Sequence, residues 1–346
     1  MKSYTDNPLV SVIVPNYNHS KYLSERLSSI INQTFQDFEL IILDDASTDD
    51  SLEIISRYVG HLPHRLIVNK ENSGSVFKQW NKGIRQAQGE YIWIAESDDY
   101  ADPTFLEKLV PLLDNNKRVG LAYCAFHLVD SNDNITGSFA DYDVPRLRGD
   151  RWKADFINDG IDECKRFLLF GNTIPNVSGV LLRRALYDKV GGANERLRLS
   201  GDWDLYVKIL LLSDIAFLAQ PLDYCRVHEE SVRGRTADIH IYEKFKVAQS
   251  VIKKTGMPEN GILEACMQQI LKLITSSADS AVPQHYLSVS GKLIIVNWKH
   301  KIGFRLYKEA VIYLLKYIRF KIALRTRVKR CAEKLKSLYN ARDKKI

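Results

Sequence analysis

Short apolar runs alternate with segments of helical periodicity along the first hundred residues, and this alternation constrains the fold most. Four runs are expected to form strands, at residues 9–14, 38–43, 65–68 and 91–95. Between them, apolar residues recur at helical spacing, as Leu52, Ile55 and Val59 do. Strands that are apolar on both faces, each followed by a helix, are typical of a parallel sheet covered by helices on both sides. The sequence therefore predicts an α/β fold.

The pattern is looser in the rest of the chain. Further strands are expected at residues 120–129 and 177–182 and a helix at 202–212, whereas 131–160 is rich in Asp, Asn and Gly and is expected to be a long loop. Strand signals fade from about residue 239, and helical signals dominate after that point. We therefore expect an α/β domain over residues 1–235 and a helical, basic region over residues 236–346.

The composition fits a globular protein of the reducing cytoplasm. Of the 346 residues, 45% are hydrophobic and 26% are charged, which is too apolar a balance for a disordered chain. Five scattered cysteines without a Cys-x-x-Cys pair argue against a disulfide framework and against a zinc ribbon. The first eight residues are polar and no run of about 18 apolar residues occurs, so we expect neither a secretory signal nor a membrane span.

The net charge of +7 is distributed unevenly. Residues 299–346 contain 16 Lys and Arg but only 3 Asp and Glu, a local charge of +13, so the remainder of the chain is mildly acidic. Within residues 303–323, apolar and aromatic side chains alternate with cations at helical spacing. Such a helix is able to lie on an anionic membrane surface, at the inner face of the membrane, or to pack on the protein with a solvated basic face. Nucleic acid is not an expected partner, because no recognised binding module accompanies the tail.

Polar clusters follow three of the expected strands, at residues 15–18, 44–49 and 96–99. In an open α/β sheet, ligands bind beyond the carboxyl ends of the strands. Capping of the following helices accounts for Ser47 or Asp49. It does not account for Glu96-Ser97-Asp98-Asp99, where like charges would repel each other without a counter-ion. A divalent cation such as Mn²⁺ or Mg²⁺, which binds one or two carboxylates and substrate phosphates, suits this cluster.

Several stretches in this order resemble the family 2 glycosyltransferases, which are inverting enzymes of the GT-A fold. They are Val10 to Asn18, Asp44 to Asp49, Asn72-Ser73-Gly74, Glu96-Ser97-Asp98-Asp99, Gly201-Asp202-Trp203-Asp204 and Tyr224 to His228. The resemblance covers about residues 8–235. It implies a Rossmann-like, mostly parallel sheet flanked by helices, followed here by the helical C-terminal region.

The resemblance also implies roles for individual residues. Asp202 matches the catalytic base, although Gly201 precedes it where the family usually has Glu. Asp98 matches the metal-binding carboxylate of an Asp-x-Asp motif whose first position is Glu96 here, one methylene longer, and whose middle position is Ser97. Glu96 and His228 are the further metal candidates. The nucleotide-sugar site is expected to comprise Pro15, Tyr17, Asn18, Asp45, Lys78, Glu96, Ser97, Asp98, Arg226 and His228, with Asp45 bonding the base and the last two lying over the diphosphate.

The chemistry of inverting transfer agrees with these residue types. A single displacement at the anomeric carbon needs one carboxylate to accept the proton of the acceptor hydroxyl. A cation stabilises the charge of the leaving diphosphate. The resemblance therefore implies a metal-dependent transferase that moves a sugar from a nucleotide diphosphate donor, with a UDP-sugar favoured, to a glycan or lipid-linked acceptor in surface polysaccharide assembly.

Two other functions compete with this interpretation. A sugar nucleotidyltransferase would need a Gly-rich basic loop after the first strand, and Pro15-Asn16-Tyr17-Asn18 has no glycine. A non-catalytic nucleotide-sugar-binding or scaffold protein of the same fold is the second alternative, supported by the departures at Glu96 and Gly201. The Gln-x-x-Arg-Trp motif of processive synthases is absent, so we expect one sugar to be transferred per encounter.

Overall fold

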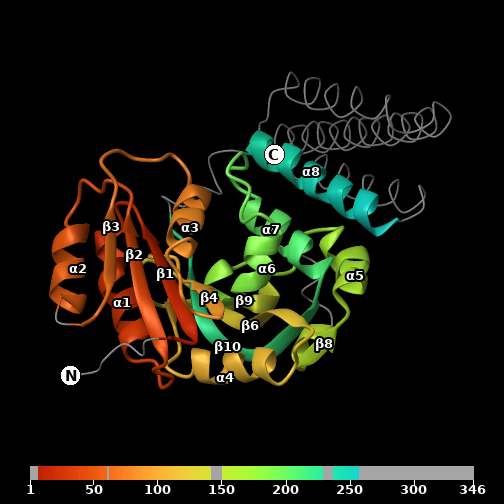
Figure 1. Cartoon of the computed structure of the whole chain (residues 1–346), viewed down its shortest axis with the longest axis horizontal. Coiled ribbons are helices and arrows are strands. Elements are labelled where there is room, and N and C mark those ends of the chain that lie inside the picture. The colour runs from red at the N-terminus through yellow and green to blue at the C-terminus, as the bar shows by residue number, and fades with distance from the viewer. Residues whose placement is uncertain (1–6, 61, 142–149, 229–236, 257–346) are drawn as a thin grey trace, which may run out of the picture. The chain divides into compact units, whose positions relative to one another are not determined.

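A computed structural model describes residues 7–60, 62–141, 150–228 and 237–256 (Figure 1). Within these residues, ten strands form one sheet in the order β3-β2-β1-β4-β9-β6-β10-β5, with β7 beside β6 and β8 beside β10. The strands are β1 Val10–Asn16, β2 Phe38–Asp44, β3 Arg65–Val68, β4 Tyr91–Ile94, β5 Tyr100–Ala101, β6 Val119–Val129, β7 Ile135–Ser138, β8 Phe156–Asn158, β9 Val180–Arg183 and β10 Asp214–Arg226.

The central strands of the sheet run in one direction, with a single reversal. β1 is parallel to β2 and β4, and β6 is parallel to β10. β9 lies antiparallel between β4 and β6. Because β9 is antiparallel to both of its neighbours, β4 and β6 run in the same direction. The strands β1, β4, β6 and β10 therefore all end at the same edge. The predicted α/β fold with a mostly parallel sheet is therefore confirmed.

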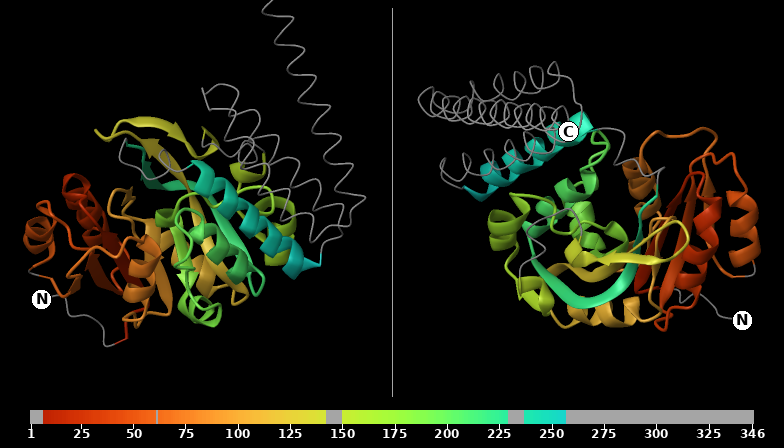
Figure 2. Two further views of the ribbon diagram at one scale, coloured as in Figure 1. Left: turned by 90° about the horizontal axis from the view of Figure 1, so that it is seen from above. Right: turned by 180° about the vertical axis from the view of Figure 1, so that it is seen from behind.

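Helices cover both faces of this sheet. They are α1 Ser20–Ile31, α2 Ser51–Val59, α3 Val76–Ile84, α4 Phe105–Asp114, α5 Gly160–Glu163, α6 Arg184–Lys189, α7 Gly201–Leu210 and α8 Ala237–Thr255. In Figure 1 the strands β6, β9 and β10 lie between α4 on one side and α6 and α7 on the other, and α8 packs outside α7. The views from above and from behind show the same layers (Figure 2).

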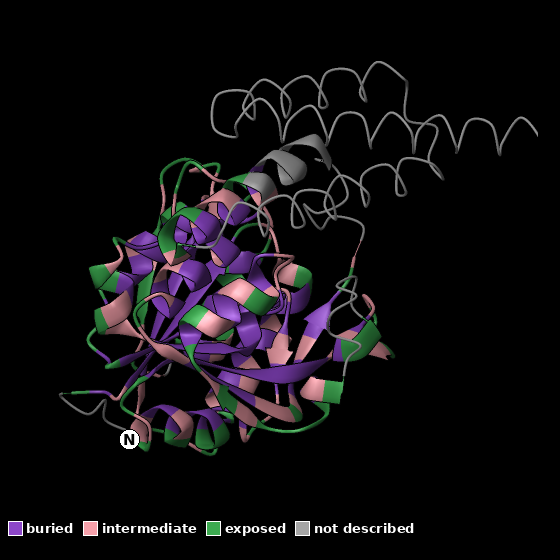
Figure 3. Ribbon diagram, turned by 90° about the vertical axis from the view of Figure 1, so that its right-hand side faces the viewer, coloured by how far each residue is buried: buried purple, intermediate pink, exposed green. Residues whose placement is uncertain are grey.

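The core follows from the two-residue period of the strands. In β1, Val10, Val12 and Val14 belong to one buried apolar cluster with side chains of α1, α2 and α4. Ile13 points to the opposite face, where α3 approaches so closely that a Cβ added at Gly83 would lie 2.7 Å from its Cγ2 atom. Both faces of β1 are thus buried, as expected for a parallel strand, and Figure 3 shows the burial concentrated in the sheet.

The predictions differ from the structure in a few segments. Val177–Gly179 forms a 3₁₀ turn, and only Val180–Arg183 of the expected strand pairs in the sheet, because the Asn176 side chain accepts a hydrogen bond from the Ser178 amide and turns the chain. The expected loop at 131–160 contains β7 and β8. Asp50 occupies the N-cap of α2, while Asp49 accepts the Ser51 amide.

The C-terminal region lies largely outside the described residues. A compact unit extends to Met257 and includes α8. The boundary expected near residue 235, the helices expected beyond residue 256 and the basic tail at 299–346 therefore stay predictions. Among the residues that the structure describes, no helix is long and apolar enough to cross a membrane.

The close approach of α3 to the sheet generates a stability prediction. In Gly83→Ala, the new methyl group would lie 2.7 Å from side-chain carbons of both Ile13 and Leu43. We expect the free energy of unfolding to fall by about 1–3 kcal/mol, the usual cost of overpacking a filled core. Arg85→Ala, at an exposed position next to the same helix, should change it by less than about 0.5 kcal/mol. Denaturant titration of both variants measures the difference, and equal stabilities would contradict the close packing.

Candidate functional site

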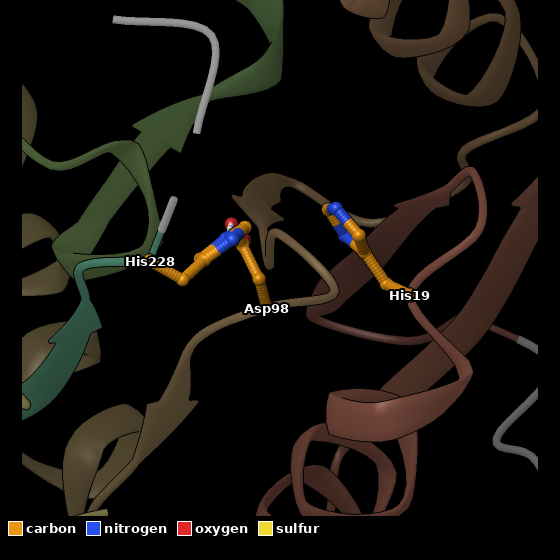
Figure 4. Close-up of side chains that lie close together, drawn as sticks. All are labelled: His19, Asp98 and His228. Atoms are coloured by element: carbon orange, nitrogen blue, oxygen red, sulfur yellow. Dashed lines mark hydrogen bonds and ion pairs between the residues drawn. The ribbon is translucent and has the colours of Figure 1, made fainter. Parts of the chain in front are cut away.

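Three connections meet at the edge where the strands end. His19 follows β1, Asp98 follows β4 and His228 follows β10. Their side chains lie close together in Figure 4, and one potential ligand atom from each lies within 4.8 Å of the others. The structure thus brings Asp98, from the expected cluster at residues 96–99, together with His228, which the family resemblance singled out, and with His19, which lies outside the expected clusters.

Each member of this His-Asp-His group is held by a neighbour. The Nε2 atom of His228 lies 3.1 Å from Oδ2 of Asp98. The Nδ1 atom of His19 lies 2.8 Å from the hydroxyl oxygen of Ser97, so this contact involves Nδ1 of the ring and not Nε2. Burial opposes ionisation of Asp98, but its hydrogen bond with His228 and the nearby imidazole of His19 outweigh this effect and lower its pKa. The group therefore combines an ionised carboxylate with two imidazoles.

Glu96 faces a different environment from Asp98. Its carboxylate accepts a hydrogen bond of 2.8 Å from the indole of Trp80. Burial, together with the negative charge of Asp98, raises the pKa of Glu96 to about 8. Glu96 and Asp98 thus differ in protonation at neutral pH, and Glu96 is not a member of the His-Asp-His group.

Arg26 on α1 is the buried counter-ion of this acidic turn. Its side chain has no exposed surface, and its Nε atom donates a hydrogen bond of 2.8 Å to the carbonyl oxygen of Glu96. The carboxylates of Asp223, Asp99 and Asp98 all attract its charge. The positive charge of Arg26 therefore offsets part of the repulsion expected within residues 96–99, without any bound cation.

Arg226 fastens the end of β10 to the neighbouring connections. Its guanidinium donates to the carbonyl oxygens of Asp98 and Asp130, at 2.7 and 2.9 Å, and to the carboxylates of Glu25 and Asp133. The side chain is only 1% exposed. In this conformation Arg226 supports the loop that carries Asp98, and contact with a diphosphate stays a prediction.

The expected base-binding loops are joined to each other by hydrogen bonds. Asn18 has the left-handed backbone conformation that Asn tolerates. Its side-chain oxygen accepts a hydrogen bond of 2.7 Å from the Thr48 backbone amide, and its backbone N–H donates to the hydroxyl oxygen of Ser47. Tyr17 is 45% exposed at the tip of this loop, whereas Pro15 is buried within β1.

Asp45 connects these loops to α3. It accepts the Ser73 amide at 2.9 Å, the Ser73 hydroxyl at 2.7 Å and the Gln79 amide at 2.8 Å. Lys78 is exposed and donates to the Ser73 carbonyl oxygen. Asp45 therefore organises the segment around Asn72-Ser73-Gly74 that the sequence singled out.

Asp202 lies in the first turn of α7, as the sequence suggested. The side-chain amide of Asn172 donates a hydrogen bond of 2.8 Å to its Oδ2 atom. Burial raises the pKa of Asp202 to about 7, and the negative charge of Glu243 on α8 acts in the same direction. A carboxylate with such a pKa accepts a proton readily near neutral pH.

Tyr206 lies within the electrostatic reach of both Asp202 and Glu96. Its hydroxyl is buried, and its pKa is raised by burial and then by the negative charges of Asp202 and Glu96. Both carboxylates therefore act on the same phenol, although they are 106 positions apart in the sequence. This places Asp202 and Glu96 in one electrostatic neighbourhood.

Sequence reasoning missed two residues of this region, His19 and Arg26, and noted Gly201 without a reason for it. His19 was not considered because a single histidine after a strand carries no recognisable pattern. Arg26 looks like a surface cation on an amphipathic helix, and only the structure reveals that it is buried. Gly201 was noted as a departure, and its reason is steric, since an added Cβ would lie 2.6 Å from the ring of Phe77.

Comparison with known proteins agrees with the fold. Residues 11–187 match the family model described as Glycosyl transferase family 2. The glycosyltransferase GlyG of Streptococcus pneumoniae serotype 4 is 42% identical over 236 residues, which cover 67% of this chain and 75% of GlyG.

Two solved structures share the fold. TarS of S. aureus in complex with UDP-GlcNAc superposes with a TM-score of 0.58 at 24% identity, covering 75% of this chain and 71% of that chain. A mannosyltransferase from Pyrobaculum calidifontis in complex with GDP-Man and Mn²⁺ superposes with a TM-score of 0.51 at 18% identity, covering 91% and 88%. At these identities the likeness extends to the fold alone.

The contacts of Asp45 generate a prediction that does not depend on any ligand. Asp45→Asn turns one acceptor oxygen into a donor that would face other donors. We expect a loss of about 1–3 kcal/mol in the free energy of unfolding and faster hydrogen exchange at the Ser73 amide. Asp50→Asn is the matched control, because Asp50 is exposed and its side chain makes no capping bond. Unchanged exchange at Ser73 in Asp45→Asn would contradict the organising role.

Proposed function

Since the chain belongs to glycosyl transferase family 2 and is a glycosyltransferase, we propose that it transfers a sugar from a nucleotide diphosphate donor to an acceptor hydroxyl with inversion at the anomeric carbon. The observation that carries this proposal is the buried carboxylate of raised pKa, Asp202, which acts on the same phenol as Glu96, two residues before Asp98 of the separate His-Asp-His group. A single displacement requires one base and stabilisation of the leaving group, and no covalent nucleophile.

Asp202 is the proposed base. Its carboxylate accepts a hydrogen bond from Asn172, which orients one oxygen, and its pKa of about 7 matches the operating range of a general base. In the reaction, Asp202 accepts the proton of the acceptor hydroxyl as the oxygen attacks the anomeric carbon. The sugar leaves the nucleotide diphosphate in the same step.

The His-Asp-His group is the proposed metal site. One carboxylate oxygen and two imidazole nitrogens are suitable ligands for a divalent ion, and nitrogen ligands favour Mn²⁺ over Mg²⁺, which prefers oxygen. The buried Nδ1 atom of His228 has no hydrogen-bond partner among the described residues, whereas its Nε2 atom contacts Asp98. A bound ion would supply Lewis-acid stabilisation of the charge on the leaving diphosphate.

The donor and acceptor are proposed by class. TarS binds UDP-GlcNAc and the Pyrobaculum mannosyltransferase binds GDP-Man, which supports a nucleotide diphosphate sugar here, with a UDP-sugar the first to test. Tyr17, Asn18 and Asp45 are the proposed contacts of the nucleotide's heterocyclic base. A glycan or a lipid-linked intermediate is the proposed acceptor, and the basic tail at residues 299–346 is proposed to bring the enzyme to an anionic membrane surface from the cytoplasmic side.

Removal of the central ligand tests the metal site. In Asp98→Ala we expect the part of UDP affinity that depends on Mn²⁺ to disappear, while affinity without metal stays within a few-fold. His19→Ala should lower Mn²⁺ affinity by at least about tenfold, the loss found even for groups that only support a ligand. Calorimetric titration of UDP with and without Mn²⁺ measures both effects.

Asp188→Ala controls for the loss of a carboxylate, because Asp188 is exposed and lines a different pocket with Asn7 and Glu90. Full Mn²⁺-dependent UDP binding by Asp98→Ala would remove Asp98 from the metal site. Equal Mn²⁺ affinity in His19→Ala would reduce the proposed ligand set to Asp98 and His228.

Neutralising the proposed base tests the reaction. Asp202→Asn keeps the shape of the side chain, so we expect donor affinity within a few-fold of wild type and a fall in kcat of about 10²–10⁴. In the wild type, kcat/KM should rise with pH through about 7, because Asp202 is protonated and inactive below its pKa. Steady-state transfer measured over a range of pH checks both points. An unchanged kcat in Asp202→Asn together with much weaker donor binding would make Asp202 a donor ligand.

A further inference from the structure

The carboxylate of Glu243 on α8 is surrounded by the backbone that leads into α7. Its Oε1 atom accepts the Arg198 amide at 2.6 Å, and its Oε2 atom accepts the amides of Leu199 and Ser200 at 2.9 and 2.8 Å. Glu243 is only 3% exposed. Three successive N–H groups that converge on one anion form an anion-binding nest, and here the anion is a side chain from 43 to 45 positions away.

The start of α7 depends on this contact because its own capping is weak. The N-cap residue of α7 is Ser200, whose side chain makes no capping hydrogen bond. The helix begins at Gly201, where the ring of Phe77 leaves no room for a side chain. Among the described residues, Glu243 is therefore the group that fixes the backbone immediately before Asp202.

Glu243 also contributes charge. Its carboxylate lies at the N-terminal end of α7, where the helix dipole favours an anion. The ionisable groups that act on Asp202 or share its surroundings are Glu243 on α8, Tyr206 on α7 and Glu96 after β4, while Asn172 offers a neutral amide. The charge of Glu243 raises the pKa of Asp202 in addition to burial.

We propose that Glu243 is a positioning residue for the transfer reaction: by binding the amides of residues 198–200 it sets the place and direction of the Asp202 carboxylate, so that α8 is part of the catalytic unit. This inference rests on the proposed role of Asp202 as the base. A purely structural role, in which Glu243 only attaches α8 to the rest of the protein, is the alternative that the experiment must separate.

The experiment compares Glu243→Gln with Val251→Ala. Val251 is fully buried on the same helix, so its truncation loosens the packing of α8 and leaves the carboxylate in place. Hydrogen exchange at the amides of residues 198–203, kcat and KM for transfer, and the pH dependence of kcat/KM are measured for both variants and for the wild type.

In Glu243→Gln we expect faster exchange at residues 198–200, a fall in kcat of about tenfold to a hundredfold from misplacement of the base, and KM within a few-fold. The rise of kcat/KM with pH should move to lower pH, because a negative charge that raises the pKa of Asp202 has been removed. Glu243→Asp keeps the charge with a shorter reach, so it should retain the wild-type pH profile while kcat falls. Val251→Ala should lower the melting temperature without changing the pH profile.

Several outcomes would overturn the proposal. If Glu243→Gln and Val251→Ala have the same kcat and pH profile, or if exchange at residues 198–200 rises while kcat is unchanged, Glu243 is structural only. If Glu243→Gln does not fold, the Glu243→Asp variant decides, and a kcat equal to wild type then overturns the proposal. Failure of the base assignment itself would appear separately, as transfer by Asp202→Asn, and the exchange measurement would still report whether Glu243 holds the loop.

Discussion

A buried guanidinium is the interaction on which the edge of the sheet depends. Arginine stays charged inside a protein, and burying it without partners would be costly. Arg26 meets this requirement in part, because its Nε atom donates to the Glu96 carbonyl oxygen and its charge is attracted by the carboxylates of Asp223, Asp99, Asp98 and Glu96. Its two terminal nitrogens have no hydrogen-bond partner among the described residues. The dependence is mutual, because the same carboxylates would repel one another without it. Since Arg26 is carried by α1, whose apolar face packs on β1, the acidic turn depends on the ordinary packing of the core.

The architecture was predictable because its signals are local. An apolar run such as Phe38–Asp44 predicts a strand by itself, and a helical stripe such as that of Ser51–Val59 predicts a helix by itself. The position of β9 was not predictable, because nothing in the sequence of Val180–Arg183 specifies that this strand lies antiparallel between β4 and β6, which precede it in the chain. The short strands β7 and β8 were missed for a related reason, as they add to longer strands and carry little apolar signal of their own.

The candidate site was predictable where a motif names residue types in sequence, and unpredictable where it is assembled by tertiary contacts. Asp98, Asp202 and His228 were expected, and the structure brings Asp98 and His228 into contact. His19 joins them only because β1 and β10 end at the same edge. The contact expected between Arg226 and a ligand stays a prediction. The protein acceptors that surround this side chain were not predictable, because they come from three separate segments of the chain.

The distances along the chain set an order of events during synthesis. Glu25 and Arg226, which bond each other in the folded protein, are 201 residues apart. At a synthesis rate of about 5–20 residues per second, about 10–40 s separate their appearance at the ribosome. For slightly less than half of this interval, from the synthesis of β4 to that of β9, β4 has a sheet partner on the side of β1 only and its other edge stays open. An open, apolar strand edge invites pairing with other chains, so the newborn protein is most exposed to aggregation before residue 183 has been made.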